Sequence, residues 1–490
     1  MNIKELLFKI DYDILKGNDD AEVCEIAYDS RRITKKNSLF VCIEGFKVDG
    51  HRFIDDAIKN GATSILVEKE IKISSEDVNI IRVKNTRKVL SEISSAFYNE
   101  PSKELNLVGI TGTNGKTSVS IIISNILENL GHKVGTIGTI DNRIGNKILE
   151  VEKNTPTTPE SLELQMLLRK MAKEKVQDVI MEVSSMALEL HRVDNCIFDI
   201  GVFTNLSQDH LDDHKTMENY KNAKLKLFTK CKYAIVNIDD SVSKDIINTA
   251  TAKIFTYGIN NSADLMAKDI RLSADGARFK ISFNKEEKGV VIKIPGLFSV
   301  YNSLAAIAVC IHLGLTLDHI ILALQDIKTV RGRAEAINTE EGYTVIVDYA
   351  HSPDALKNIL TTVKGFAKGE VITVFGCGGD RDKSKRPIMG KIAGENSQFC
   401  VITSDNPRTE EPLQILYNIE EGIKETHCSY KKILDRKEAI HFAMDSAKSG
   451  DVIVIAGKGH ETYQILKDRT IKFDDMEVVK EYLKKKVGVK

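Results

Sequence analysis

The chain has 490 residues, which at ~150 residues per domain predicts about three domains. Hydrophobic residues make up 42% and charged residues 28%, proportions typical of a globular protein that buries several cores. The 69 Lys and Arg residues balance 70 Asp and Glu residues. The net charge of −1 therefore shows no basic excess of the kind that binding to nucleic acid or an anionic membrane requires.

The spacing of the cysteines and the lengths of the apolar runs bear on the cellular compartment of the protein. The eight cysteines are scattered, with no Cys-x-x-Cys pair and no spacing typical of a zinc site, so we expect reduced thiols. The first residues lack the apolar core of a signal peptide, and no stretch reaches ~18 uninterrupted apolar residues. These features predict a cytoplasmic protein without membrane insertion.

The chain alternates short β-branched runs with longer amphipathic ones, and polar breaks divide it near residues 99–103 and 331–333. One helix is predicted at Ser118–Leu130, ended by Gly131. The predicted strands are Leu107–Thr111, Asp178–Val183, Ile200–Thr204, Tyr233–Asn237, Thr344–Asp348, Glu370–Phe375, Phe399–Thr403 and Val452–Ala456. This alternation favours an α/β fold with parallel, doubly wound sheets, in which functional residues gather at the carboxyl ends of strands.

A glycine-containing loop, Gly-Thr-Asn-Gly-Lys-Thr at 112–117, connects the first of these strands to the predicted helix. Glycines let backbone N–H groups face a phosphate, and the helix N-terminus adds a favourable dipole. In such a loop Lys116 reaches the β- and γ-phosphates of ATP, and the Thr117 hydroxyl binds Mg²⁺. The spacing departs from the strict Gly-x4-Gly-Lys-Thr form, because Ile110 occupies the position of the first glycine. A plain strand-to-helix turn is the structural alternative.

Three further side chains are candidates for a metal site. Glu182 ends one predicted strand, and His210 follows the next strand along the chain. Together they could complete the coordination of Mg²⁺, although this ion prefers oxygen ligands and taken singly each residue is more often structural. Lys224 lies in a lysine-rich amphipathic stretch at 220–228, and its position alone predicts a solvated lysine.

Four motifs, taken together and in order, resemble those of the Mur ligase family of bacterial peptidoglycan synthesis. They are the loop at 112–117, Glu-Val-Ser-Ser at 182–185, Thr-Asn-Leu at 204–206 followed by Asp-His-Leu at 209–211, and Asp-Tyr-Ala-His at 348–351. The resemblance implies three domains: an N-terminal UDP-binding α/β domain at 1–102, a central P-loop ATPase domain with a parallel sheet at 103–332, and a C-terminal Rossmann-like domain at 333–490.

Five more motifs are similar to those of the family member that adds the third residue of the stem peptide. They are Asp-Ser-Arg at 29–31, Thr-Thr-Pro at 157–159, Gly-Cys-Gly-Gly-Asp-Arg at 376–381, Asp-Asn-Pro-Arg at 405–408 and Gly-Lys-Gly-His-Glu at 457–461. The resemblance implies an ATP-dependent ligase that joins an amino acid to the D-glutamate side-chain carboxylate of UDP-N-acetylmuramoyl-L-alanyl-D-glutamate. An acyl phosphate would be the intermediate.

The resemblance also implies the site residues. ATP would be bound by Gly112, Thr113, Asn114, Gly115, Lys116, Thr117, Ser118, Asn302, Arg333 and Asp348, the last of which could instead cap a strand end. The nucleotide sugar would contact Tyr28, Ser30, Thr157, Thr158, Ser184 and Arg192. The amino acid would contact Arg381, Asp405, Asn406, Pro407, Arg408, Gly457 and Glu461. The implied catalytic residues are Lys116, Glu182, His210 and Lys224, with Thr117, Glu182, His210 and Lys224 as Mg²⁺ ligands and Lys224 carried as a carbamate (N6-carboxylysine) formed from CO₂.

The motif at 405–408 bears on which amino acid is added. In the family this form is associated with meso-diaminopimelate, which differs from lysine by a carboxylate on its distal carbon. Arg408 can bind that carboxylate bidentately, whereas lysine would leave the guanidinium unpaired. Discrimination of ~10²-fold or more is then expected. Glu461 suits an ammonium group, and an ordinary Asx-Pro turn is the structural alternative.

The expected cofactors are ATP, two Mg²⁺ ions and the CO₂ of the carbamate, and the expected partners are the UDP-sugar dipeptide and meso-diaminopimelate alone. We expect a cytoplasmic monomer that acts in cell wall biogenesis, and so in cell shape and division. Three alternatives remain: the same reaction with L-lysine, a folylpolyglutamate-synthase-like ligase, and a P-loop switch or mechanical ATPase that a macromolecule stimulates.

Overall fold

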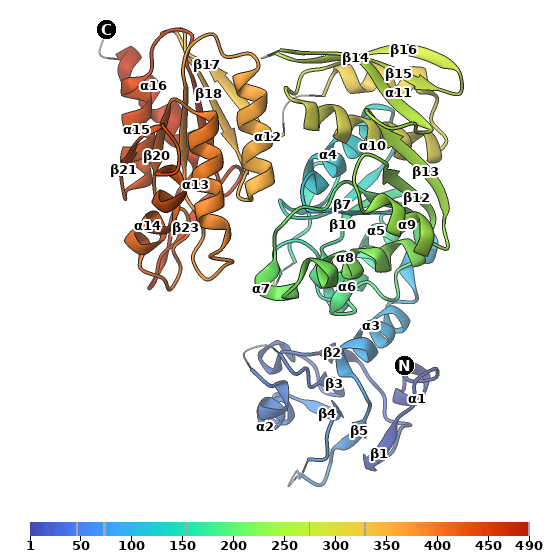
Figure 1. The fold of residues 1–490 in the computed structure, drawn as a ribbon. Helices are drawn as coiled ribbons and strands as arrows, with labels where there is room; N and C mark the ends of the chain where they lie inside the picture. The colour runs from blue at the N-terminus through green and yellow to red at the C-terminus, as the bar shows by residue number, and fades with distance from the viewer. Residues whose placement is uncertain (46–47, 72–74, 152–154, 274, 328–329, 489–490) are drawn as a thin grey trace. The chain divides into compact units, whose positions relative to one another are not determined.

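The structure is a computed structural model that describes all residues except 46–47, 72–74, 152–154, 274, 328–329 and 489–490 (Figure 1). The chain forms two compact units, one made of Met1–Thr111, His132–Gly201 and Lys226–Tyr233 and the other of the remaining segments. Within the described residues, the strands form four sheets, of five, eleven, six and two strands. No helix in this part of the chain has both the length and the apolar character needed to cross a membrane.

The N-terminal sheet has the order β1-β5-β4-β3-β2 and is parallel except for β1. Its elements are α1 (Ile3–Leu6), β1 (Asp13–Lys16), β2 (Glu25–Ala27), β3 (Ser38–Val41), α2 (Ile54–Lys59), β4 (Ala62–Val67), β5 (Asn79–Arg82) and α3 (Thr86–Phe97). Successive residues of β3 alternate between two apolar clusters, Leu39 packing with α3 and Phe40 with α2. Both faces of this sheet are therefore covered.

The eleven-stranded sheet has the order β16-β15-β14-β13-β12-β11-β6-β10-β7-β8-β9. The strands before residue 240 are β6 (Asn106–Thr111), β7 (Val134–Ile137), β8 (Asn142–Ile144), β9 (Lys147–Ile148), β10 (Asp178–Glu182), β11 (Phe198–Phe203) and β12 (Cys231–Asn237). The later strands are β13 (Lys253–Gly258), β14 (Leu265–Ser273), β15 (Gly276–Phe283) and β16 (Glu286–Ile292). The helices are α4 (Lys116–Asn129), α5 (Ser161–Lys173), α6 (Ser185–Glu189), α7 (Leu211–His214), α8 (Met217–Leu225), α9 (Ser243–Thr249), α10 (Leu297–His312) and α11 (Leu317–Gln325).

The parallel part of this sheet confirms the α/β prediction. β10 pairs in parallel with both β6 and β7, and in register Glu182 lies opposite Ile110. The predicted strands at 107–111, 178–183, 200–204 and 233–237 are present as β6, β10, β11 and β12. The predicted helix is α4, which begins two residues earlier than expected, at Lys116.

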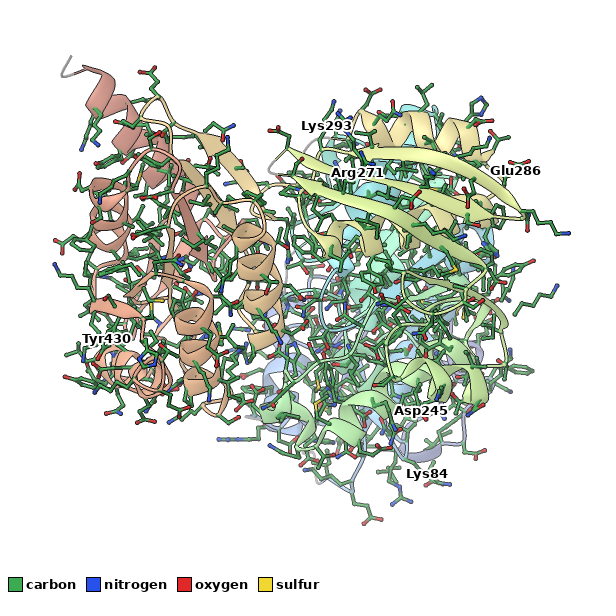
Figure 2. The ribbon with its side chains drawn as sticks, turned by 45° about the horizontal axis from the view of Figure 1, so that its top comes forward. Lys84, Asp245, Arg271, Glu286, Lys293 and Tyr430 are labelled. Carbon is green, nitrogen blue, oxygen red and sulfur yellow. The ribbon has the colours of Figure 1, made fainter. Side chains whose placement is uncertain are left out.

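An antiparallel extension of the sheet was not predicted. β14, β15 and β16 pair antiparallel, and the turn between β15 and β16 consists of Asn284 and Lys285, both with positive φ (49° and 66°). Two residues with positive φ match the twist of a hairpin, but Asn-Lys lacks the usual Asn-Gly signal. In Figure 2, Glu286 and Lys293 mark the two ends of β16, and both side chains are exposed.

The C-terminal sheet has the order β17-β18-β22-β19-β20-β21 and is parallel except for β17. Its strands are β17 (Glu335–Asn338), β18 (Thr344–Asp348), β19 (Val371–Phe375), β20 (Phe399–Ile402), β21 (Ser429–Lys432) and β22 (Val452–Ala456), and β23 (Tyr463–Ile465) pairs with β24 (Thr470–Lys472). The helices are α12 (Pro353–Lys364), α13 (Lys385–Asn396), α14 (Pro412–Ile423), α15 (Arg436–Ser446) and α16 (Asp475–Gly488).

Helices cover both faces of the C-terminal sheet. Apolar residues of α12, α13 and α14 pack on one face and those of α15 and α16 on the other (Figure 1). Helix α12 has a local start signal, because Ser352 accepts a hydrogen bond from the Ala355 N–H (3.4 Å) and Pro353 occupies its first turn. All four strands predicted in this third are present, which confirms the doubly wound arrangement.

A buried ion pair joins the starts of α15 and α16. Arg436 donates from Nε and Nη2 to the two carboxylate oxygens of Asp475, both at 2.7 Å, and both side chains are fully buried. Replacing Asp475 with Asn leaves a buried guanidinium without its anion, so we expect the C-terminal part to lose about 3–5 kcal/mol of stability. Urea unfolding followed by circular dichroism should show an earlier transition. The matched control is Lys437→Gln, which removes the exposed partner of Glu481, and an equal shift in both variants would contradict the prediction.

Candidate active site

The loop at 112–117 leads from β6 into α4 and contains two glycines in backbone conformations that residues with a side chain rarely adopt. Gly112 has φ 149° and Gly115 has φ 90°. A Cβ atom at Gly112 would lie 1.9 Å from Oγ1 of Thr204, and one at Gly115 would lie 2.7 Å from Oδ1 of Asn302. Both positions therefore require glycine. Gly115 is the N-cap of α4, so the loop ends at a helix N-terminus, where backbone N–H groups favour an anion.

Thr204 and Asn205, at the end of β11, brace this loop. The Asn114 N–H donates to Oδ1 of Asn205 at 3.0 Å, and the Asn114 carbonyl accepts from Nδ2 of Asn205 (3.0 Å) and Oγ1 of Thr204 (2.6 Å). The Thr113 N–H donates to the Asn205 carbonyl at 2.8 Å. Asn205 was not predicted as a site residue. The Thr-Asn-Leu motif was the available signal, since a polar residue directly after a buried strand lies at the functional edge of a sheet.

Lys116 and Lys224 converge on one carbonyl oxygen. The Nζ atoms of both lysines donate to the Gly112 carbonyl at 2.9 Å, and Lys116 also donates to the Thr113 carbonyl at 2.9 Å. Lys224 is only 2% exposed, and its Nζ lies 4.4 Å from the centre of the Tyr220 ring. The prediction of a solvated lysine from position alone is therefore wrong, because Tyr220, Ala223 and Lys224 form the buried side of α8.

The environment of Lys224 favours a neutral amine. Burial lowers its pKa well below the usual value, the Lys116 ammonium lowers it further, and Asp209 opposes both effects. An unprotonated amine is the form that adds CO₂. The residues present thus fit a carbamate at this position.

His210 lies among carboxylates at the start of α7. Its side chain is 47% exposed, with Nε2 at 3.8 Å from Asp209 and Nδ1 at 3.9 Å from Asp213. Ligand atoms of His210, Asp212 and Asp213 all lie within 4.8 Å of one another. Desolvation lowers the pKa of His210 and Asp209 opposes this, so the imidazole is kept in the neutral form that can bind a cation.

Asp209 is a buried anion that was not predicted as a site residue. Its Oδ1 lies 3.6 Å from Nζ of Lys385, and its Oδ2 lies 3.7 Å from Nε2 of His351. Although burial opposes ionisation, the Lys385 ammonium and the hydrogen bond from the His210 N–H hold the pKa of Asp209 well below its usual value. Asp209 therefore supplies a permanent negative charge next to His210.

Glu182 ends β10 and is 2% exposed. Its Oε1 accepts from the Thr139 N–H at 2.9 Å, and its Oε2 accepts from Oγ1 of Thr139 at 3.0 Å. Two hydrogen bonds from one residue fix the orientation of this carboxylate. Thr139, which follows β7, was not predicted.

Four of the predicted sugar-contacting residues gather near the end of β10. Oγ1 of Thr158 donates to the Glu182 carbonyl at 2.9 Å and accepts from the Ser184 N–H at 3.0 Å. Nη1 of Arg192 donates to the Thr158 carbonyl at 3.3 Å. Oγ1 of Thr157 lies 3.2 Å from Oγ1 of Thr139. The motifs at 157–159 and 182–185 thus belong to one cluster.

The other two predicted sugar contacts lie in the N-terminal segment. The Tyr28 hydroxyl donates to Oε1 of Glu163 at 2.7 Å. Ser30 is buried and starts a short 3₁₀ helix, Ser30–Arg32, whose N-cap Asp29 accepts from the Arg31 N–H. Sequence reasoning had not linked Tyr28 to Glu163, which is 135 residues away.

Two of the predicted adenosine and phosphate contacts, Asn302 and Arg333, lie next to the loop. Oδ1 of Asn302, on α10, is the nearest atom to a Cβ built on Gly115, and Nη2 of Arg333 donates to Oγ1 of Thr117 at 3.2 Å. Ser118 follows in the first turn of α4. Asp348 instead accepts from the Ala334 N–H at 2.7 Å, which supports the alternative that it caps the end of β18.

The predicted amino-acid residues lie together after β19, β20 and β22. Nδ2 of Asn406 donates to Oε2 of Glu461 at 2.9 Å. Gly457 has φ 116°, and a Cβ there would lie 2.6 Å from Oδ2 of Asp405, so only glycine fits. The carbonyl of Pro407 packs even more closely on Gly379, where a Cβ would lie 1.9 Å from it.

Two arginines face the same loop of this cluster. Arg408 adopts φ 53°, and its Nη1 donates to the Gly379 carbonyl at 2.7 Å. A Cβ built on Gly378 would lie 2.9 Å from Nη1 of Arg408 and 3.7 Å from Cγ of Arg381. Arg381 is 49% exposed. The two arginines and Glu461 thus belong to one cluster of predicted amino-acid residues, which contains cationic and anionic side chains.

Comparison with known proteins identifies the family. Three family models match successive segments: "Mur ligase family, catalytic domain" at 22–98, "Mur ligase middle domain" at 110–310 and "Mur ligase, glutamate ligase domain" at 332–459. The chain is 49% identical over 484 residues to the UDP-N-acetylmuramoyl-L-alanyl-D-glutamate--2,6-diaminopimelate ligase of Caldanaerobacter subterraneus subsp. tengcongensis, covering 99% of each chain. It is 47% identical to the Clostridium botulinum ligase of the same name, covering 99% of this chain and 100% of the relative.

Similar solved structures also include Mur ligases. A diaminopimelate ligase of that name is 31% identical with a TM-score of 0.69, covering 99% of each chain. A MurF ligase from Thermotoga maritima, solved with ADP, shares the fold at 20% identity, with a TM-score of 0.63 and coverage of 94% and 97%. Folylpolyglutamate synthase from Mycobacterium tuberculosis matches 75% of this chain at 15% identity, with a TM-score of 0.63, so the folate-type alternative shares the fold alone. The chain therefore belongs to the Mur ligase family.

Proposed function

We propose that this chain adds meso-diaminopimelate to the D-glutamate side-chain carboxylate of UDP-N-acetylmuramoyl-L-alanyl-D-glutamate, a step of peptidoglycan precursor synthesis. As a Mur ligase, it is an ATP-dependent enzyme that forms an amide bond and releases ADP and phosphate. The observation that carries the proposal is the full-length similarity, at 49% identity, to a ligase of that name. The presence of Arg408, Arg381 and Glu461 in one cluster after β19, β20 and β22 supports it.

The reaction proceeds in two transfers. The D-glutamate carboxylate attacks the γ-phosphorus of ATP, which gives an acyl phosphate and ADP. The deprotonated amine of diaminopimelate then attacks the acyl carbon, and phosphate leaves. Repulsion between two anions opposes the first transfer, and the Lys116 ammonium at the start of α4 offsets that repulsion. Glu461, held by Asn406, orients the amino acid through its ammonium group.

We further propose two Mg²⁺ ions and a carbamate on Lys224. Thr117 and Glu182 would hold one ion, and His210 with the carbamate would hold the other. Bound Mg²⁺ supplies additional positive charge between the two reacting anions. Two observations support this assignment. Burial and the Lys116 ammonium lower the pKa of the Lys224 amine well below its usual value, and desolvation lowers the pKa of His210.

The domain bounds 1–102, 103–332 and 333–490, a monomeric state and a cytoplasmic location are also part of the proposal. The family matches at 22–98 and 110–310 fall within the first two ranges, and the match at 332–459 begins one residue before the third. All eight cysteines are free thiols, which accords with a reducing compartment.

Phosphate release is the experiment that tests the function. Purified protein is mixed with ATP, Mg²⁺ and UDP-N-acetylmuramoyl-L-alanyl-D-glutamate, and meso-diaminopimelate or L-lysine is added in parallel. We expect release only with diaminopimelate, and a product heavier by that amino acid less water. A preference for lysine would contradict diaminopimelate as the substrate but would still support a ligase that adds an amino acid to this UDP-sugar dipeptide. No response to either amino acid would contradict the proposal and favour the folate-type or macromolecule-stimulated alternatives.

Arg408 provides a test of substrate choice. In Arg408→Ala the distal carboxylate of diaminopimelate loses its bidentate partner, so we expect kcat/KM for diaminopimelate to fall by about 10² or more. The already low kcat/KM for lysine, which lacks that carboxylate, should change little. The control is Arg469→Ala, at an exposed arginine before β24. An equal loss for both amino acids would show that Arg408 does not contact the distal carboxylate.

A further inference from the structure

We propose that Lys458 determines amino-acid specificity by neutralising Glu461, so that the pocket rejects a substrate with a lone distal ammonium. This inference rests on the proposed function and names a residue to which that function assigns no role. It concerns the Gly-Lys-Gly-His-Glu motif at 457–461, of which only Gly457 and Glu461 were expected to contact the amino acid.

Lys458 is fully buried within the cluster of predicted amino-acid residues. Its side chain is 0% exposed, and its Nζ donates to Oε2 of Glu461 at 2.8 Å and to Oδ1 of Asn406 at 3.2 Å. Asn406 in turn donates from Nδ2 to the same Oε2 at 2.9 Å, and its Oδ1 also accepts from the Ile465 N–H at 2.9 Å. Both ends of the Asn406 amide are thus engaged within the protein, and Oε2 of Glu461 already accepts two hydrogen bonds.

The backbone around Lys458 is built to hold the side chain there. Gly457 and Gly459 flank it with φ of 116° and 51°. A Cβ at Gly457 would lie 2.6 Å from Asp405, and one at Gly459 would lie 2.6 Å from the Gly332 carbonyl. A buried ammonium is strongly destabilising unless it is paired, and the loop keeps this one beside Glu461 rather than in solvent.

The consequence for substrate choice follows from charge. With Lys458 in place, Glu461 and Lys458 form a neutral pair. The two other cations of the cluster, Arg408 and Arg381, outnumber its one other carboxylate, Asp405, so the cluster is net positive. The distal carbon of diaminopimelate bears an ammonium and a carboxylate, so its net charge there is zero, and its carboxylate can pair with Arg408. Lysine would bring an uncompensated positive charge into this net positive cluster. Like-charge repulsion of this kind is a common way to exclude a close analogue.

The test compares kcat/KM for meso-diaminopimelate and for L-lysine in the full-length protein, measured by phosphate release with saturating ATP and UDP-substrate. In Lys458→Met, which keeps the length of the side chain but not its charge, we expect the diaminopimelate-to-lysine ratio to fall by at least about 10-fold, with kcat/KM for lysine itself rising. Lys458→Arg should keep the ratio of the wild type. Parallel losses for both amino acids in Lys458→Met would show a structural role only and overturn the inference.

Glu461→Gln gives an independent result should Lys458→Met not fold. It removes the anion and keeps the cation, so the pocket becomes more positive and the ratio should rise. If Glu461 only binds the distal ammonium, the variant should lower kcat/KM equally for diaminopimelate and lysine, because both carry that ammonium. An unchanged diaminopimelate-to-lysine ratio would therefore overturn the inference. Failure of the proposed function is distinguishable from either outcome, since the wild type would then release no phosphate with diaminopimelate.

Discussion

The Lys116→Ala variant is expected to lose phosphate release by about 10³-fold or more while it still binds the UDP-substrate. Lys116 is the first residue of α4, and its Nζ lies 2.9 Å from the carbonyls of Gly112 and Thr113, inside the phosphate loop. Removing one preorganised positive group from a site where negative charge develops typically costs about 10²–10³ in kcat. In the proposed site the same group would also bind the phosphates of ATP, so the larger loss is expected.

Binding of the UDP-substrate is measured separately, by calorimetry without ATP. The predicted sugar contacts Thr158, Ser184 and Arg192 belong to a different compact unit from Lys116, so the dissociation constant should stay within about 2-fold of wild type, which is less than 1 kcal/mol. The control is Lys244→Ala, at an exposed lysine of α9. Loss of UDP-substrate binding in Lys116→Ala would contradict the assignment of separate sites, and full turnover would contradict the phosphate role.

Local signals made the phosphate loop predictable. A β-branched run ending in a glycine loop and followed by an amphipathic segment specifies β6, the loop and α4 from adjacent residues. The two glycines of that pattern, Gly112 and Gly115, both adopt positive φ in the structure, which glycine does readily. The four predicted strands of the C-terminal sheet were predictable for the same reason, because each is a short, mostly apolar run. The polar strands β17 and β21 were not predicted.

Contacts between distant residues were not predictable from pattern. Asn205 braces Asn114 across 91 positions of sequence, and Lys458 pairs with Asn406 across 52 positions. Lys224 is another residue whose contacts could not be predicted from the local sequence. The composition of its helix favours solvent-exposed lysines, but in the fold Lys224 donates to the Gly112 carbonyl, 112 positions earlier in the sequence. Tertiary packing, rather than local propensity, decides which of several lysines is buried.

The hydrogen bonds among the predicted amino-acid residues could not be predicted from the sequence. The Asn406 amide is occupied by Glu461, Lys458 and the Ile465 N–H. Asn406 therefore orients Glu461 in this structure rather than presenting its own amide to a ligand. Only the three-dimensional arrangement separates a residue that contacts a substrate from one that positions its neighbour.

Replacing Lys224 with Ala should lower kcat by about 10² or more, and short carboxylic acids such as formate or acetate should restore part of the activity. The wild-type amine is buried, and burial together with Lys116 lowers its pKa, which favours the neutral form that takes up CO₂. The Ala variant leaves space where the side chain stood. A small carboxylate entering that space can supply the two anionic oxygens that a carbamate would have presented.

The comparison with Lys221→Ala makes this result specific. Lys221 is on the same helix, but it lies in ion pairs with Glu218 and Asp245 at 2.9 Å and has no contact with the phosphate loop among the described interactions. We expect Lys221→Ala to keep its activity and to show no response to added acids. If neither formate nor acetate restores Lys224→Ala, the amine itself is what the site requires. The bond from Lys224 to the Gly112 carbonyl, shared with Lys116, would then be its role, and the carbamate would be excluded.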